Sequence, residues 1–255
     1  MAATFDFTGK RAVVTGAGKG IGHDLVLALH ACGAHVHAVS RTRADLDALR
    51  AELAEAGDAR LTTFAADLGN AEEVRAALEA AGDIDLLVNN AAVALNGPLL
   101  EMSVESWDAT MAVNLRACFV ATQVAGKSMR DRGVKGSIVN VSSQASLVAT
   151  PEHAAYCASK AGLDMLTKMS ALELGPYGIR CNAVNPTVVL TAMGRANWSD
   201  PAKAGRMLSK IPLGRFAEVD DVVRPILFLL SGECGMVTGS LLPIEGGFTS
   251  TATLK

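Results

Sequence analysis

The sequence predicts one α/β domain: a doubly wound parallel sheet of about seven strands with helices on both faces. Three observations carry this prediction. Short β-branched or apolar runs alternate with longer helical segments, a glycine-rich turn joins the first run to the first helix, and neither a linker nor a repeat interrupts the 255 residues. We therefore treat residues 1–255 as a single domain.

The predicted strands are short apolar runs near residues 12–15, 35–40, 61–66, 85–89, 137–142, 180–185 and 241–244. Helices are expected between them. In the helix predicted over residues 43–56, three leucines at positions 46, 49 and 53 form one apolar stripe, as in a helix that covers a sheet face. Asn70, with Glu73 three residues later, predicts the N-terminal cap of the next helix.

The second half of the chain predicts further helices over residues 152–174 and 220–230, and two segments depart from simple alternation. Residues 103–132 follow a helical pattern with Asn114 in the middle. Asn is a weak helix former that bonds nearby backbone, so we expect a break or kink there. Residues 187–212 are the least regular piece and are predicted to form a loop over the substrate site.

Composition and charge argue against several classes of protein. The net charge is −3 and the 23 basic residues are scattered, so nothing indicates a nucleic-acid surface. The chain start lacks the regions of a signal peptide, and no apolar run is long enough for a membrane span. The five cysteines are odd in number and widely spaced, which predicts reduced thiols in a cytoplasmic protein and no metal site. Cys157, next to Tyr156 in the sequence, is the thiol to watch for modification.

Residues 12–22, AVVTGAGKGIG, predict a buried strand that turns through glycines into an apolar helix. Gly16, Gly20 and Gly22 let the backbone turn sharply, approach a pyrophosphate and pack the helix against the strand. The N-terminus of that helix then faces the phosphates. Glycines also close ordinary turns, but the strand, the helix and the spacing together favour a dinucleotide site.

The end of the second strand predicts which cofactor binds. A carboxylate there would hold the ribose 2′-hydroxyl of NAD. This chain has Ser40 and Arg41, followed by Thr42 and Arg43, and Lys19 lies inside the glycine loop. Those groups suit a 2′-phosphate, so we predict NADP(H). The alternative for the two arginines is a solvated helix start, although cations are mildly unfavourable at that end of a helix.

A serine, a tyrosine and a lysine form the candidate catalytic group. Tyr156 follows Ser143 by thirteen residues, and Lys160 lies one helical turn further on. An ammonium near a phenol favours the phenolate, so Tyr156 could exchange protons near neutral pH. An ordinary helix with a core tyrosine and a snorkelling lysine would show the same pair. Ser142 is the alternative to Ser143, and the spacing to Tyr156 favours Ser143.

Several motifs occur in a fixed order: TGAGKGIG at 15–22, Asp67-Leu68, NNAA at 89–92, Asn114, NVSS at 140–143 and Tyr156-x-x-x-Lys160. In this combination the whole chain resembles the short-chain dehydrogenase/reductase family. The resemblance implies a Rossmann-type domain, usually a homotetramer, that uses a nicotinamide cofactor. It also implies that Tyr156 is the acid/base, that Lys160 holds ribose hydroxyls and assists the tyrosine, that Ser143 binds the substrate oxygen and that Asn114 holds a relay water.

The same resemblance implies the cofactor contacts. Asp67 is expected near the adenine, although it could instead cap the following turn; Asn89 and Asn90 are expected near the adenosine ribose. The segment 186–191 is expected around the nicotinamide. The full set of implied cofactor residues is Gly16, Lys19, Gly20, Ile21, Gly22, Ser40, Arg41, Thr42, Asp67, Leu68, Asn89, Asn90, Ala91, Tyr156, Lys160, Pro186, Val188, Val189 and Thr191.

NNAA at 89–92 departs from the family's usual NNAG, and Asn-Pro-Thr at 185–187 from Asn-Pro-Gly. With VSRT at 39–42 and WSDP at 198–201, these departures are similar to one carbonyl reductase branch of the family. That likeness implies NADPH-dependent reduction of L-xylulose to xylitol and of small α-dicarbonyls such as diacetyl. The expected substrate-binding residues are Ser143, Gln144, His153, Tyr156 and Trp198. His153 could equally be an ordinary helix-start residue, and Trp198 a lid.

Two other functions stay open on the sequence. The first is a reductase of the same fold that acts on a steroid, quinone or acyl thioester, which the polar Gln144 and His153 disfavour. The second is a nucleotide-binding protein without turnover. Replacement of a catalytic residue would favour the second, and none is replaced.

Overall fold

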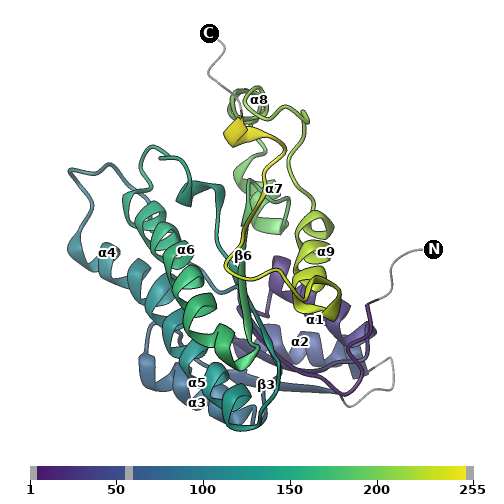
Figure 1. The fold of residues 1–255 in the computed structure, drawn as a ribbon. Helices are drawn as coiled ribbons and strands as arrows, with labels where there is room; N and C mark the ends of the chain where they lie inside the picture. Colours follow the sequence, from purple (N-terminus) through teal and green to yellow (C-terminus); the bar gives the residue numbers. More distant parts are fainter. Residues whose placement is uncertain (1–4, 55–59, 251–255) are drawn as a thin grey trace.

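The computed structural model describes residues 5–54 and 60–250, in which a parallel sheet lies between two layers of helices (Figure 1). In the described part of the chain the sheet has seven strands in the order β3-β2-β1-β4-β5-β6-β7. The strands are β1 Arg11–Thr15, β2 His35–Ser40, β3 Leu61–Ala65, β4 Leu86–Asn89, β5 Ser137–Val141, β6 Arg180–Pro186 and β7 Leu241–Ile244. The predicted parallel sheet is confirmed, with each strand end within one residue of its predicted place.

Helices cover both faces of the sheet, because alternate strand residues point to two separate apolar cores. Val14 belongs to the core formed with α1 (Gly20–Ala31), α2 (Arg43–Ala54) and α9 (Val219–Leu230). Val13 belongs to the core formed with α3 (Ala71–Ala80), α5 (Ala117–Asp131) and α6 (Ala154–Leu174). The leucine stripe of α2 is buried as predicted; positions 55–56 of that predicted helix lie outside the described residues.

The strand order reverses direction between β1 and β4, because β2 and β3 extend the sheet on one side of β1 and β4 to β7 on the other. Ligands of open α/β sheets bind at the carboxyl ends of the strands at such a switch point. The loops that follow β1 and β4 meet there. A Cβ at Gly16 would lie 2.8 Å from the Cα of Ala91.

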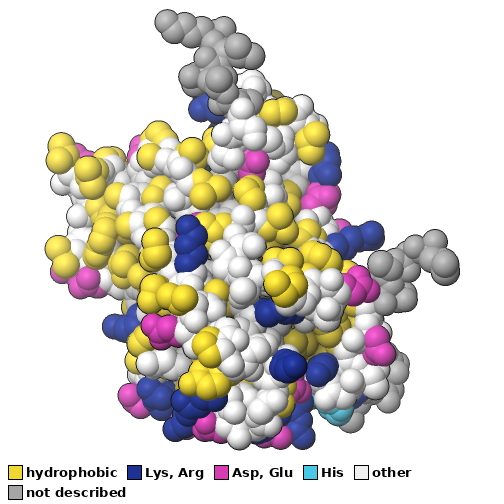
Figure 2. Space-filling model, in the orientation of Figure 1, with side chains coloured by type: hydrophobic (Ala, Val, Ile, Leu, Met, Phe, Trp, Pro, Cys, Tyr) yellow, Lys and Arg dark blue, Asp and Glu magenta, His cyan; other side chains and the backbone are white. Residues whose placement is uncertain are grey.

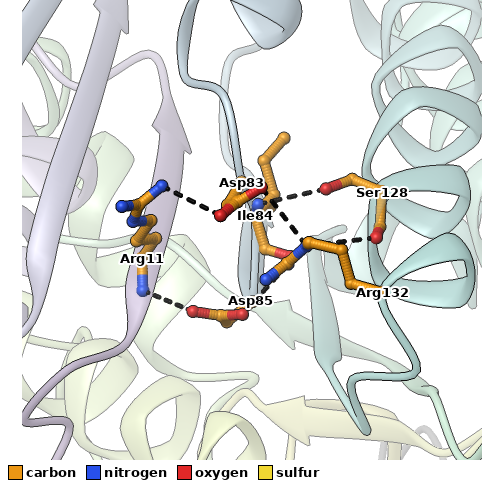
Figure 3. A network of polar contacts seen from close by, with 6 residues as sticks. All are labelled: Arg11, Asp83, Ile84, Asp85, Ser128 and Arg132. Atoms are coloured by element: carbon orange, nitrogen blue, oxygen red, sulfur yellow. Dashed lines mark hydrogen bonds and ion pairs between the residues drawn. The ribbon is translucent and has the colours of Figure 1, made fainter.

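A charged network closes the opposite end of β1 and β4 (Figure 3). Asp85 accepts a hydrogen bond from the Arg11 backbone N–H at 2.9 Å and pairs with Arg132 at 3.0 Å. Asp83 pairs with Arg11 at 3.2 Å, and the Ile84 N–H donates to Ser128 Oγ at 3.2 Å. Since Ser128 and Arg132 lie at the end of α5, the network joins that helix to the two central strands, away from the ligand crevice.

The segment around Asn114 is helical throughout, but its geometry changes in the middle. Helix α4 (Val104–Met111) continues through a π-helical stretch, Ala112–Arg116, directly into α5. The wider turn is the irregularity predicted at Asn114. It is a bulge within one helix, and such bulges are frequent at functional sites.

Residues 187–212 are more regular than predicted, because they contain α7 (Ala192–Asn197) and α8 (Pro201–Leu208). Side-chain caps start both helices. Thr191 accepts from the Gly194 N–H, and Asp200 accepts from the Ala202 N–H with a proline at the first helical position. The apolar periodicity of these short helices is too brief to reveal them from the sequence.

The remaining helical turns are of the 3₁₀ type: Gln144–Ser146, Gly175–Tyr177, Gly232–Cys234 and Phe248–Ser250. On the surface, Figure 2 shows apolar side chains gathered over α4 and α6. Among the described helices, none combines the length and the apolar character that a bilayer crossing requires.

Candidate active site

Lys160 is the most unusual buried residue of the site. Its side chain is on α6, is only 2% exposed, and donates from Nζ to the Val141 carbonyl oxygen at 2.7 Å, at the end of β5. A buried ammonium is costly unless hydrogen bonds compensate for its lost hydration. The same Nζ lies 5.7 Å from the centre of the Tyr156 ring. The fold therefore holds a positive charge beside a phenol, as the spacing predicts.

The serine alternatives differ in how their hydroxyls are used. Ser142 is buried and donates to the backbone oxygen of Lys160 at 3.3 Å. Ser143 Oγ accepts from the Ala145 N–H at 3.1 Å, which leaves its hydrogen available for donation. This geometry favours Ser143 as the serine that contacts a substrate oxygen.

Asn114 joins three elements from inside the π-helical stretch. Its Oδ1 accepts from the Val93 N–H at 2.8 Å, and its Nδ2 donates to the Val93 carbonyl at 2.9 Å and to Ser159 Oγ at 3.1 Å. The side chain is fully buried. It therefore fixes the loop after β4 against the helix that carries Tyr156 and Lys160.

The glycine loop is packed too tightly for side chains. A Cβ at Gly22 would lie 2.2 Å from the Gly16 carbonyl oxygen and 2.5 Å from Asn90 Nδ2. Gly16 has a φ of +65°, which favours glycine. Asn90 donates to the carbonyls of Thr15 and Gly16 at 3.0 and 3.1 Å, so the loop after β4 holds the loop after β1 in shape.

The two asparagines expected near the ribose therefore have different surroundings. Asn89 is buried and donates to Asn140 Oδ1 at 2.8 Å, and Asn140 in turn donates to Thr167 Oγ1 at 2.8 Å. The Asn89 amide is therefore part of a buried series of side-chain hydrogen bonds. Asn90 and Ala91 are half-buried at the glycine loop.

Asp67 is exposed and its carboxylate accepts from the Gly69 N–H at 2.9 Å. It therefore forms the turn cap that the sequence left open as its alternative role. Leu68 is buried beside it in the core shared with α3 and α5.

The glycine loop also meets the end of β2. A Cβ at Gly18 would lie 2.7 Å from Ser40 Oγ and 2.8 Å from the Asp45 Cβ. Lys19 Nζ lies 3.4 Å from Asp45 Oδ2. Arg41 and Thr42 are exposed next to this cluster, while Ile21 is half-buried. The sequence predicts Lys19, Ser40, Arg41 and Thr42 here, but it does not predict Asp45.

The segment after β6, which is expected around the nicotinamide, comes close to the glycine loop. A Cβ at Gly20 would lie 2.9 Å from Thr191 Cγ2. Val189 pairs with Ala217, and the Leu190 N–H donates to the Ala217 carbonyl at 2.8 Å. Pro186 ends β6, and Val188 is half-buried.

The candidate substrate residues are less closely grouped. Gln144 is buried, and its Oε1 has no hydrogen-bond partner among the described residues. His153 Nε2 lies 2.9 Å from Asn96 Nδ2, its Nδ1 lies 2.6 Å from the Pro151 oxygen, and its ring meets the Tyr156 ring edge-on at 6.2 Å. Both ring nitrogens are thus already engaged, with Nε2 accepting. No pattern in the sequence predicts the contact between His153 and Asn96.

Trp198 packs on Phe216 with the ring centres 5.3 Å apart, and Lys203 Nζ lies 4.8 Å from the indole centre. This anchors Trp198 to the segment that follows α8. A contact with the catalytic residues is not among its described interactions.

Thiols and metals add little to the site. Burial raises the pKa of Cys118 to about 11 and that of Cys181 to about 12, so both are inert core thiols. Cys157, beside Tyr156, is free and half-buried. In the described parts of the chain, no group of histidine, cysteine and acidic side chains could hold a metal ion.

Comparison with known proteins identifies the family. The family model described as enoyl-(acyl carrier protein) reductase matches residues 16–249. The chain is 58% identical to L-xylulose reductase of Mesocricetus auratus over 95% of this chain and 98% of that protein. It is 57% identical to L-xylulose reductase of Homo sapiens over 94% of this chain and 96% of that protein.

A solved structure agrees with these relatives. Gluconate 5-dehydrogenase from Burkholderia cenocepacia, in complex with NADP and tartrate, superposes with a TM-score of 0.91 at 33% identity, covering 98% of both chains. Matching fold, matching motifs and identity above one half over nearly the whole length agree with one another. The chain belongs to the short-chain dehydrogenase/reductase family of oxidoreductases.

Proposed function

We propose that this chain is an NADPH-dependent carbonyl reductase that reduces L-xylulose to xylitol and small α-dicarbonyls such as diacetyl. One observation carries the proposal above all: the buried Lys160 ammonium, held by the Val141 carbonyl, lies 5.7 Å from the Tyr156 ring. The substrate class is supported by the names of the hamster and human relatives.

The residues of the crevice fit a nicotinamide dinucleotide. Backbone atoms and Asn90 already occupy the space that Cβ atoms at Gly16 and Gly22 would fill, so only glycine fits at these two positions. The loop therefore carries no side chain there, at the start of α1, where the N–H groups of a helix N-terminus suit phosphates. Lys19, Ser40 and Arg41 supply donors and positive charge for a 2′-phosphate. The NADP bound to the Burkholderia protein supports this choice of cofactor.

In the proposed mechanism, bound NADPH supplies the hydride that adds to the carbonyl carbon. Tyr156 donates its phenolic proton to the carbonyl oxygen, and Ser143 donates its free hydroxyl hydrogen to the same oxygen. Lys160 stabilises the resulting phenolate. Asn114 keeps the loop and the helix in register, and the π-helical stretch is the proposed place of the relay water.

A polar substrate suits the side chains around Tyr156. The unpartnered Gln144 Oε1 is an acceptor for a sugar hydroxyl, because buried polar atoms without partners are rare. His153 flanks the Tyr156 ring and shapes the site. Trp198 is the proposed lid, carried by the segment 187–212.

The proposal includes a homotetramer in the cytoplasm with a place in xylose and carbohydrate metabolism. All five cysteines are free, which suits a reducing compartment. Exposed Phe119, Met165, Met169 and Leu172 on α5 and α6 suit a contact between copies.

Oxidation of NADPH with L-xylulose, diacetyl and a bulky steroid ketone, each repeated with NADH, tests the proposal. We expect fast turnover of the first two substrates and a preference for NADPH. Activity confined to the bulky ketone would leave the family intact and refute the substrate assignment. A preference for NADH would refute the cofactor assignment.

The proposed role of Tyr156 has its own test. Tyr156→Phe removes only the hydroxyl, so we expect kcat to fall by about 10²- to 10⁴-fold while NADPH affinity stays within a few-fold. Tyr177→Phe, at the other tyrosine of the chain, is the matched control and should leave kcat unchanged. Full activity of Tyr156→Phe would contradict the mechanism.

A further inference from the structure

An acidic side chain lies inside the cluster of cationic and hydroxyl groups proposed to bind the 2′-phosphate. Asp45, in the first turn of α2, is 3.4 Å from Lys19 Nζ, and the two side chains are 19% and 78% exposed. The carboxylate is therefore largely shielded from solvent, while the lysine side chain is exposed. The ribose-binding carboxylate of NAD enzymes normally ends β2, where this chain has Ser40 instead.

Gly18 shows how closely Asp45 is packed against the glycine loop. A Cβ at Gly18 would lie 2.8 Å from the Asp45 Cβ, 3.3 Å from its Oδ2 and 2.7 Å from Ser40 Oγ. Asp45 and Ser40 thus both pack against the loop that carries Lys19. The N-terminus of α2 favours a negative charge at this position.

Resting on the proposed NADP function, we propose that Asp45 determines how strongly the protein selects the 2′-phosphate, by competing with that phosphate for Lys19. With Asp45 in place, Lys19 is already paired when the cofactor arrives. Binding of the 2′-phosphate must then draw the ammonium away from a carboxylate. A cofactor without the 2′-phosphate does not need Lys19 to leave Asp45. Asp45 therefore lowers the affinity for NADP(H) relative to that for NAD(H).

The sign of the effect follows from the charges. Asp45→Asn removes the competing charge but keeps the size of the side chain, and it leaves Lys19 free for the phosphate. Exposed ion pairs are individually weak, so we expect the affinity for 2′-phosphorylated ligands to rise by about three- to tenfold. The affinity for ligands without that phosphate should change by less than about twofold.

Equilibrium binding of 2′,5′-ADP and of 5′-AMP, measured by calorimetry on the full chain, tests the proposal without relying on turnover. These probes differ in the 2′-phosphate alone. Asp47→Asn is the matched control: it makes the same charge change two residues along α2, where Asp47 lies 3.9 Å from Arg50. We expect Asp45→Asn to tighten 2′,5′-ADP selectively and Asp47→Asn to have no such effect.

The Lys19→Met background separates the two ways in which Asp45 could act. If Asp45 acts through Lys19, the gain from Asp45→Asn should fall by at least half in that background. An undiminished gain would mean direct repulsion of the phosphate and would overturn the proposal, as would weaker 2′,5′-ADP binding by Asp45→Asn or an equal change for both probes.

Asp45→Ser repeats the test if Asp45→Asn is not stable. Equal affinity of the wild-type chain for both probes would refute the NADP assignment. The inference about Asp45 is tested separately, by the change in 2′,5′-ADP affinity between the wild type and Asp45→Asn.

Discussion

Glu152 shows at the level of one residue how the fold constrains the site. In the part of the chain that the structure describes, it is the single non-glycine residue with a positive φ, at +64°. Its carbonyl oxygen accepts from the Gly97 N–H at 2.9 Å, one residue before His153. A side chain in this region of φ costs roughly 1–2 kcal/mol, and such strain tends to persist at functional sites. The turn before Tyr156 is therefore held in shape by the loop after β4.

We expect Glu152→Gly to release this strain, because glycine adopts positive φ without a Cβ penalty. The free energy of unfolding should rise by about 0.5–1 kcal/mol, the rest being offset by the greater freedom of glycine in the unfolded chain. Thermal melting at one fixed protein concentration measures it. Glu152→Ala keeps the Cβ and should give no gain; an equal gain in both variants would show that the carboxylate, not the backbone, was unfavourable.

At the level of an element, the shape of the glycine loop depends on close packing where β1, α1 and the loop after β4 meet. We expect Gly22→Ala to cost about 3 kcal/mol or more, because its methyl would lie 2.2 Å from a backbone carbonyl oxygen. Binding of NADPH should weaken with it, since the displaced backbone is the proposed phosphate loop. Chemical denaturation and cofactor titration measure the two effects.

Gly205→Ala is the control for that variant. Gly205 is in α8 and a Cβ there would have no neighbour within 4 Å. Alanine is the better helix former, so this change should stabilise the protein by about 0.5–1 kcal/mol. If Gly22→Ala were equally harmless, the close packing of the loop would be refuted.

The elements that sequence reasoning predicts well are those with a strong local signal. The strands follow from β-branched runs, and the irregular turn at Asn114 follows from a poor helix former in a helical pattern. Helices α7 and α8 are started by the caps Thr191 and Asp200 and are too short for a periodic pattern. Contacts between distant segments leave no local pattern at all, so Asp45 beside Lys19 and Asn96 beside His153 emerge only from the fold.

At the scale of the whole molecule, two histidines make opposite contributions to the change of the free energy of unfolding with pH. Burial lowers the pKa of His37 below its ordinary 6.5. Burial also opposes protonation of His23, but its hydrogen bonds to Asp24 and Glu52 outweigh that effect and raise its pKa. The folded state therefore binds a proton at His37 less readily, and at His23 more readily, than the unfolded chain does.

Because the unfolded chain gains a proton at His37 as pH falls below about 6.5, His37 makes the protein less stable on that side. We expect His37→Asn to lose less stability than the wild type between neutral pH and the lower pKa of His37. His23→Asn should lose more over the same change, since it gives up a contribution that is fully present below pH 6.5 and is lost above its raised pKa. Denaturation at a series of pH values measures both slopes, and identical slopes would refute the assignment.

The proposed tetramer is also a property of the whole molecule, and its apolar face can be tested directly. Leu172 on α6 is 71% exposed. A hollow of about 630 Å³, lined by residues such as Leu115, Phe119 and Leu166, lies where α4, the π-helical stretch and the start of α5 face α6. Exposed apolar patches of this kind mark contact surfaces. A buried, unpaired carboxylate at a subunit contact is strongly unfavourable, so we expect Leu172→Glu to form a smaller species than the wild type in light scattering. Ala76→Glu places the same charge on the exposed side of α3 and should keep the wild-type mass; a smaller species from both variants would mean that added negative charge, and not this face, disrupts the assembly.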